Sequence, residues 1–188
     1  MPERVTIAEY DPAWADRFAE IAASVSNALG PLALAIEHVG STSVPGLAAK
    51  PIIDIDIAVG DQHAVQEAIR LLAVLGYEHR GDLGVPGREA FSIPPGAIPH
   101  HLYVCTSDNP EFKRHLAFRD RLRSHRGIAE RYGDLKRRLA AQFGNDREGY
   151  TAAKTGFIEQ VLSEIRECAE CADRERDAAF GESDFEQR

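Results

Sequence analysis

The sequence lacks long hydrophobic runs and has few cysteines. No apolar stretch in its 188 residues approaches the roughly 18 to 20 residues that a membrane-spanning helix requires. The opening segment carries acidic residues and no apolar core, so we expect no secretory signal, no membrane span and a cytoplasmic location. Its three cysteines include a single C-x-x-C pair, Cys168 and Cys171, without the second pair of a zinc site. We expect reduced thiols there, with a zinc or redox role as the alternative.

The composition is that of one globular domain. With 44% hydrophobic and 28% charged residues, a chain of 188 residues can bury an ordinary core. We expect one domain over residues 1–166. Residues 167–188 hold eight acids, three bases and few apolar side chains, so we expect an acidic tail without fixed structure there.

Positive charge is concentrated in one part of an acidic chain. The net charge is −8, yet residues 113–138 hold ten bases and three acids. Such a segment indicates a phosphate-bearing ligand or nucleic acid, with a solvated helix face as the alternative. Because aromatic side chains for base stacking are not interleaved there and the whole chain is acidic, we regard nucleic acid as the weaker interpretation.

Hydrophobic periodicity predicts a helix-rich α/β protein. Apolar residues three and four positions apart alternate along the chain with short apolar strands. The predicted strands are 32–39, 51–59, 88–93 and 100–105, and the predicted helices are 11–30, 61–77 and three more around 112–122, 128–143 and 157–165.

Two aspartates lie on one predicted strand. Residues i and i+2 of a strand project from the same face, so Asp54 and Asp56 point together while the isoleucines between and beside them point into a core. Paired carboxylates on an apolar strand need a compensating cation, and their hard oxygens suit Mg²⁺ or Mn²⁺ shared with substrate phosphates. The alternative is a half-exposed strand with two solvated acids.

A Gly-Ser step comes just before this strand. Gly40 leaves space for a ligand, and Ser41, Thr42 and Ser43 offer amides and hydroxyls to a phosphate. An ordinary Ser/Thr/Gly turn is the alternative. Together the apolar strand, the Gly-Ser step, the short connector and the Asp-x-Asp strand resemble the nucleotidyltransferase superfamily of DNA polymerase beta type.

A more specific resemblance extends over roughly residues 5 to 165. The segments IEHVGSTSVPGLAAKPIIDIDIAV, HHLYV, FKRHLAFRDRLRSH and YTAAKTGFIEQVL are similar to those of the GrpB family, which also occurs fused to dephospho-CoA kinase in some bacteria. The resemblance implies a minimal nucleotidyltransferase fold, a mixed β-sheet packed by helices with a helical C-terminal part. It implies no defined activity, since kinship of fold does not establish function.

The third carboxylate typical of this superfamily is missing from the predicted strand 100–105. Alternation places His101 and Tyr103 on one face of that strand, and we expect them to face the pocket. His101 is the candidate general base. Glu37 and Glu89 are the other candidates for the missing acid.

Four bases are candidates to neutralise phosphates. A lysine or arginine can pair with a phosphate, although each taken singly is more often a surface charge. The candidates are Lys50, Arg88, Arg119 and Lys154.

These residues leave two functions open. One is a Mg²⁺-dependent nucleotidyltransferase that acts from a nucleoside triphosphate on an unknown acceptor. The other is a non-catalytic accessory module that binds a nucleotide or a precursor of coenzyme A. The aspartates favour the enzyme, and the missing third acid favours the binding module.

Overall fold

A computed structural model describes the backbone of residues 5–183 and the side chains of residues 5–168, 170 and 171. Its strands form one five-stranded sheet in the order β1-β2-β5-β4-β3. β2 and β5 run parallel at the centre, and the other neighbours are antiparallel. The strands are β1 (Ala35–Val39), β2 (Ile53–Val59), β3 (Glu78–His79), β4 (Arg88–Ser92) and β5 (His100–Thr106).

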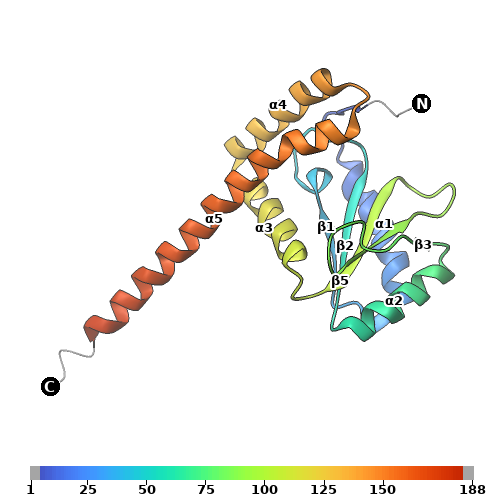
Figure 1. Ribbon diagram of the computed structural model, residues 1–188, viewed down its shortest axis with the longest axis horizontal. Coiled ribbons are helices and arrows are strands. Elements are labelled where there is room, and N and C mark those ends of the chain that lie inside the picture. Colours follow the sequence, from blue (N-terminus) through green and yellow to red (C-terminus); the bar gives the residue numbers. More distant parts are fainter. Residues whose placement is uncertain (1–4, 184–188) are drawn as a thin grey trace.

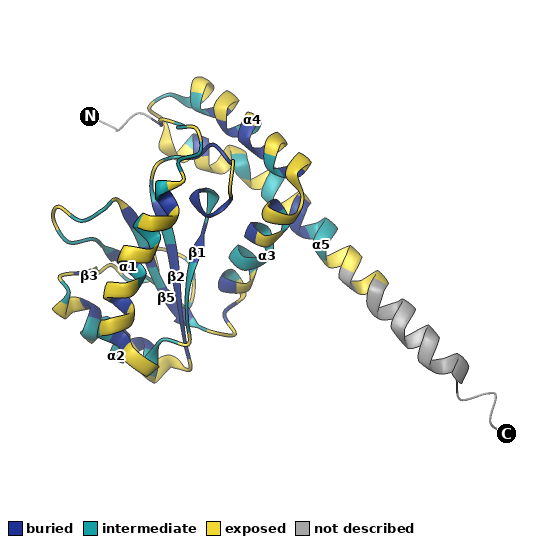
Figure 2. Cartoon of the chain, turned by 180° about the vertical axis from the view of Figure 1, so that it is seen from behind, coloured by how far each residue is buried: buried dark blue, intermediate teal, exposed yellow. Residues whose placement is uncertain are grey.

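Helices cover both faces of this sheet. In Figure 1, α1 and α2 lie on one side and α3, α4 and α5 on the other, and Figure 2 shows β2 and β5 buried between the two layers. The α-helices are α1 (Ala13–Leu29), α2 (Gln62–Val74), α3 (Pro110–Ser124), α4 (Arg126–Phe143) and α5 (Arg147–Ser183), and the short 3-10 helices are η1 (Gly30–Leu32) and η2 (Ser41–Ser43).

Capping residues fix where two of the helices begin. The Asp61 side chain accepts a hydrogen bond from the Ala64 amide at 2.8 Å, which satisfies one of the free amides at the start of α2. Asn109 does the same for the first amides of α3, and Pro110 occupies the first helical position. Since α3 begins directly beyond β5, this cap directs the basic helix back across the sheet.

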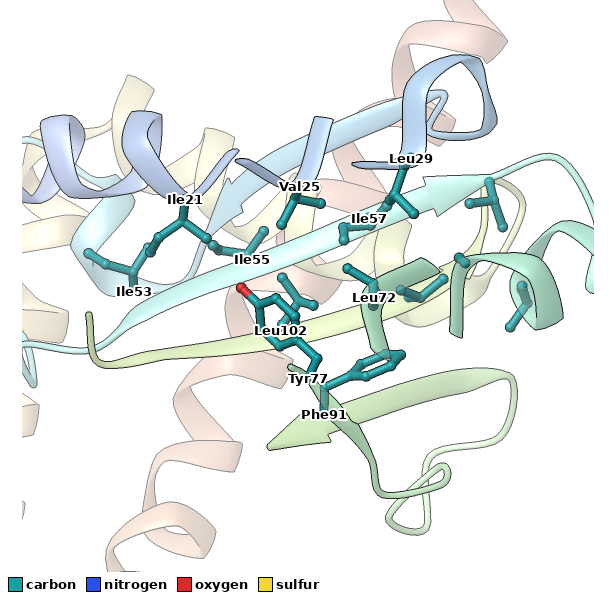
Figure 3. Packing of buried hydrophobic residues seen from close by; sticks show 14 of the residues in the cluster. Ile21, Val25, Leu29, Ile53, Ile55, Ile57, Leu72, Tyr77, Phe91 and Leu102 are labelled. Carbon is teal, nitrogen blue, oxygen red and sulfur yellow. The ribbon is translucent and has the colours of Figure 1, made fainter. Parts of the chain in front are cut away.

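The main core lies between the sheet and the α1–α2 layer. Ile53, Ile55 and Ile57 of β2 are almost completely buried and pack with Leu102 of β5 against α1 and α2 (Figure 3). Alternation along the strands therefore turns the residues between them toward α3, α4 and α5. Asp54 and Asp56 of β2 and His101 and Tyr103 of β5 share that second face.

The predicted mixed sheet packed by helices, with a helical C-terminal part, is confirmed. The predicted strand 32–39 is shorter, because Gly30–Leu32 forms a 3-10 helix, and the two-residue strand β3 was not predicted. α5 continues past the predicted domain boundary at residue 166 as far as Ser183. The domain boundary and the acidic tail over 167–188 stay predictions, and residues 184–188 lie outside the described part. No helix within residues 5–183 has the length and apolarity that crossing a membrane requires.

Candidate functional site

The parallel pairing of β2 with β5 places the two aspartates beside a histidine and a tyrosine. Asp54 is opposite His101, and Asp56 is opposite Tyr103, all on the face toward α3–α5. Nδ1 of His101 lies 2.7 Å from Oδ1 of Asp54. An ionised carboxylate only accepts hydrogen bonds, so Nδ1 carries the proton and the neutral ring has its lone pair on Nε2.

Asp56 is buried and paired with a residue of α3. Its Oδ2 lies 2.6 Å from Nδ1 of His115, while its Oδ1 is buried without a hydrogen-bond partner. Burial alone would lower the pKa of His115, but hydrogen bonds to Asp56 and Glu111 outweigh it and raise this pKa to about 9. The imidazolium of His115 therefore compensates Asp56 at neutral pH.

The Gly-Ser loop contacts Asp54 directly. Gly40 has φ of 67°, and a Cβ atom there would lie 2.1 Å from Oδ2 of Asp54. The Thr42 hydroxyl donates to the carbonyl of Ile52, and the Ser43 hydroxyl donates to that of Gly40. The hydroxyls of Thr42 and Ser43 thus hold the loop in shape.

Two adjoining cavities meet at Asp54, and Ser41, Thr151 and Lys154 also line both. The first, of about 240 Å³, we call the basic chamber, and it also contains His101. The second, of about 330 Å³, we call the aromatic chamber. The bases of the basic chamber are Lys50, Lys136, Arg147 and Lys154, and the rings of the aromatic chamber are Tyr103, Phe118 and Tyr132, with Arg88, Arg114 and His115 beside them.

The predicted phosphate ligands Lys50, Arg88 and Lys154 all line these chambers. The guanidinium carbon of Arg88 lies 4.2 Å from the ring centre of Tyr103, and its Nε is buried without a partner. Burial is the main cause that raises the pKa of Tyr103, so this phenol stays neutral. The Lys154 ammonium lies 4.4 Å from the ring centre of Tyr150.

Five predicted site residues are not brought into either chamber, namely Glu37, Ser43, Asp56, Glu89 and Arg119. Nη1 of Arg119 donates to Glu37 Oε2 at 2.6 Å, so this pair ties α3 to β1 rather than leaving a free base or a free third acid. Glu89 lies on the opposite face from Arg88, where it pairs with His79 at 2.6 Å. The predictions of Arg119 as a phosphate ligand and of Glu37 and Glu89 as pocket acids therefore find no support in the geometry.

The sequence interpretation missed several residues that the structure adds to the site. His115 lies four residues after Glu111 on α3, a spacing that marks one helix face and that could have indicated the cluster. Lys136 was counted only among the bases of segment 113–138. Its ammonium donates to the Ala48 carbonyl and lies 4.7 Å from the ring centre of Tyr132, contacts that no local pattern predicts.

The described residues contain no group of three or more His, Cys, Asp or Glu side chains arranged to hold a metal ion. What the site offers a hard cation is one oxygen from each aspartate, Oδ2 of Asp54 beside Gly40 and the unpartnered Oδ1 of Asp56. Two oxygens fit Mg²⁺ only when ligand phosphates and water supply the other positions. A metal site thus stays a proposal.

Fold and site together define an α/β protein in which a mixed sheet presents Asp54 to a basic pocket beside a Gly-Ser loop and buries Asp56 two residues further along the same strand. The chain belongs to the GrpB family, since the model of that family, described as GrpB protein, matches residues 4–164. This confirms the resemblance seen in the sequence.

Individual relatives agree with this assignment. The crystal structure of the conserved protein GrpB from Enterococcus faecalis is 39% identical with a TM-score of 0.76, covering 85% of this chain and 96% of that one. The UPF0157 protein YqkA of Bacillus subtilis is 39% identical over 155 residues, which are 82% of this chain but only 45% of that protein. A dephospho-CoA kinase of Mycolicibacterium paratuberculosis is 26% identical over 169 residues, covering 77% of this chain and 42% of the kinase.

Proposed function

We propose that this protein binds a nucleoside triphosphate, or a related phosphate-bearing molecule, together with Mg²⁺ or Mn²⁺, and that it transfers a nucleotidyl group to an acceptor hydroxyl. The observation that supports this most is the position of Asp54. It lies between Gly40, His101 and two chambers that carry several bases. A carboxylate beside several bases suits a metal-bound polyphosphate, which needs both kinds of partner.

The aspartates would hold the cation through Asp54 Oδ2 and Asp56 Oδ1. A buried acceptor without a partner, such as Asp56 Oδ1, costs about 1–3 kcal/mol, and a ligand would remove that cost. Bound Mg²⁺ would supply charge neutralisation at the phosphates. Arg88 and Lys154, which both line the aromatic chamber, would contact the phosphates.

His101 is the candidate base for the transfer. With Nδ1 held by Asp54, Nε2 would accept the proton of the acceptor hydroxyl. The acceptor oxygen would then bond to the α-phosphorus, the bond from that phosphorus to the bridging oxygen would break, and pyrophosphate would leave. The hydrogen bond that Nδ1 of His101 donates to Asp54 fixes the tautomer that this step needs.

Loss of one aspartate tests the metal site. Asp54→Asn should weaken binding of a non-hydrolysable nucleoside triphosphate at least about tenfold in Mg²⁺, because one charged ligand is removed. The matched control is Asp61→Asn, since asparagine caps a helix as well as aspartate does. Titration calorimetry measures both variants. Equal affinity with excess EDTA, or an unchanged Asp54→Asn variant, would rule out the metal site.

A second candidate function is a non-catalytic module that binds a nucleotide or a coenzyme A precursor. It is favoured by the compensation of Asp56 by His115, and no third carboxylate lines either chamber among the described residues. The related kinase adds support, since its name associates a similar sequence with dephospho-CoA. Substitution of His101 separates this module from the enzyme.

His101→Ala should leave nucleotide affinity within about threefold and lower pyrophosphate release by about 10² to 10⁴, because a general base acts mainly on the transition state. Pyrophosphate release from a labelled nucleoside triphosphate in the presence of a cell extract is the measurement. His63→Ala, at an exposed histidine on α2, is the control. A parent protein that binds nucleotide but releases no pyrophosphate with any extract would favour the binding module.

A further inference from the structure

The basic chamber collects more positive charge than the protein itself compensates. Lys136 is only 2% exposed, and its ammonium donates to a backbone carbonyl, that of Ala48. In the part of the chain that the structure describes, no ion pair involves Lys136, Arg147 or Lys154. Among the residues whose side chains are described, the only carboxylate that lines this chamber is that of Asp54.

Bases that lie this close together at a partly buried site destabilise one another. Burial is the largest cause that lowers the pKa of both Lys136 and Lys154, and repulsion by neighbouring bases lowers it further. Lys136 faces Lys154 and Arg137 as like charges and Asp54 as the opposite charge. An anionic group in the chamber would relieve this repulsion and give the ammonium groups charged partners.

The chambers differ in which reacting group they contain. His101 lines the basic chamber and not the aromatic chamber, whereas Tyr103, Phe118 and Arg88 line only the aromatic chamber. A base must lie within hydrogen-bond reach of the proton that it takes, so the acceptor hydroxyl belongs on the side of His101. The rings of the other chamber suit a nucleobase, which stacks on aromatic side chains.

We infer that the acceptor is a small alcohol bearing a phosphate or a comparable anionic group, seated in the basic chamber while the nucleotide occupies the aromatic chamber. This inference rests on the proposed function, because it assigns the second substrate of that reaction. The basic chamber is small, about 240 Å³, which favours a compact acceptor over a polymer.

Inorganic phosphate is a suitable probe for the anionic group of the acceptor. We expect phosphate to bind the free protein and to bind the protein that is saturated with Mg²⁺ and a non-hydrolysable nucleoside triphosphate. The two dissociation constants for phosphate should be similar. Arg147→Gln should weaken phosphate binding at least about tenfold, as expected for loss of a charged hydrogen bond, and leave nucleotide affinity within about twofold. ³¹P NMR titration measures the phosphate and calorimetry the nucleotide.

The controls make the assignment reciprocal. Arg88→Gln should weaken nucleotide binding and spare phosphate, because Arg88 lines only the aromatic chamber. Arg131→Gln, at an exposed position of α4, should change neither affinity. Lys136→Met should weaken phosphate binding as Arg147→Gln does. Because Lys136 is buried, thermal unfolding of the Lys136→Met variant is measured first. If Lys136→Met does not fold, the substitution of the exposed Arg147 still tests the inference.

The outcomes separate this inference from the proposed function. If phosphate competes with the nucleotide, and Arg147→Gln weakens nucleotide binding, the basic chamber holds the phosphates of the nucleotide itself. In that case the inference about the acceptor is wrong, while the proposed function stands. If phosphate binds in a manner that depends on Arg147 but no nucleotide binds at all, the anion site is upheld and the proposed function is overturned. Phosphate binding that Arg147→Gln leaves unchanged would overturn the inference alone.

Discussion

Asp54 is the residue on which the site depends most. Its Oδ1 fixes the ring of His101, its Oδ2 contacts the Gly-Ser loop at Gly40, and its carboxylate lines both chambers. One side chain thereby links the Gly-Ser loop, His101 and both chambers. This arrangement requires the loop to approach Asp54 closely.

The close approach at Gly40 is directly testable. Gly40 and Gly46 both have positive φ, 67° and 78°, so an added methyl group strains either backbone by roughly 1–2 kcal/mol. Only at Gly40 would the methyl group also collide with Asp54, and overpacking typically adds about 1–3 kcal/mol. Gly40→Ala should therefore destabilise the protein more than Gly46→Ala, as measured by urea unfolding.

Binding should separate the same two variants. Displacement of Asp54 in Gly40→Ala should weaken nucleotide binding in Mg²⁺, whereas Gly46→Ala, which has open space around its Cβ position, should bind like the parent protein. Two variants of equal stability and equal affinity would show that the Gly-Ser step is an ordinary turn.

At the scale of elements, α3 pairs with one acid of β2 and one acid of β1. His115 of α3 pairs with Asp56, and Arg119, one turn further along the same face, pairs with Glu37 and also donates to the carbonyl of His38 at 3.2 Å. The helix therefore contacts the two strands through buried charged groups. Its low apolar content is explained by these contacts.

The pair between Arg119 and Glu37 should act on stability rather than on binding. Arg119→Met keeps most of the side-chain volume but leaves Glu37 without its charged partner, so we expect a loss of about 2–4 kcal/mol in the free energy of unfolding. The exposed Arg131→Met should change it by less than about 0.5 kcal/mol. Urea titration is the measurement. A folded Arg119→Met variant of normal stability that no longer binds nucleotide would restore Arg119 as a phosphate ligand.

Local patterns predicted the elements well and the contacts between elements poorly. Alternation along β2 and β5 was enough to predict that Asp54, Asp56, His101 and Tyr103 share one face. The face of Glu89 depends on how β4 pairs with β5, and the roles of Arg119 and His115 depend on how α3 crosses the sheet. Those relations join residues distant in sequence, and one sequence alone carries no local signal for them.

At the scale of the whole molecule, three bases of the basic segment 113–138 make contacts within the protein. Arg119 contacts β1, Arg123 donates through two nitrogens to the Ser43 carbonyl, and Lys136 donates to the Ala48 carbonyl. This concentration of charge therefore supports the Gly-Ser loop and its connector.

The parallel contact between β2 and β5 has a consequence for the order in which the protein folds. Asp54 and His101 are 47 residues apart, and Asp56 and His115 are 59 apart. Closing such long loops costs entropy before any contact compensates it, so non-local pairing of this kind slows folding. Arg147 and Lys154 join the basic chamber from a still later helix. During synthesis from the N-terminus, the Gly-Ser loop and β2 thus leave the ribosome well before their partners, and the two chambers are complete only when nearly the entire domain has been made.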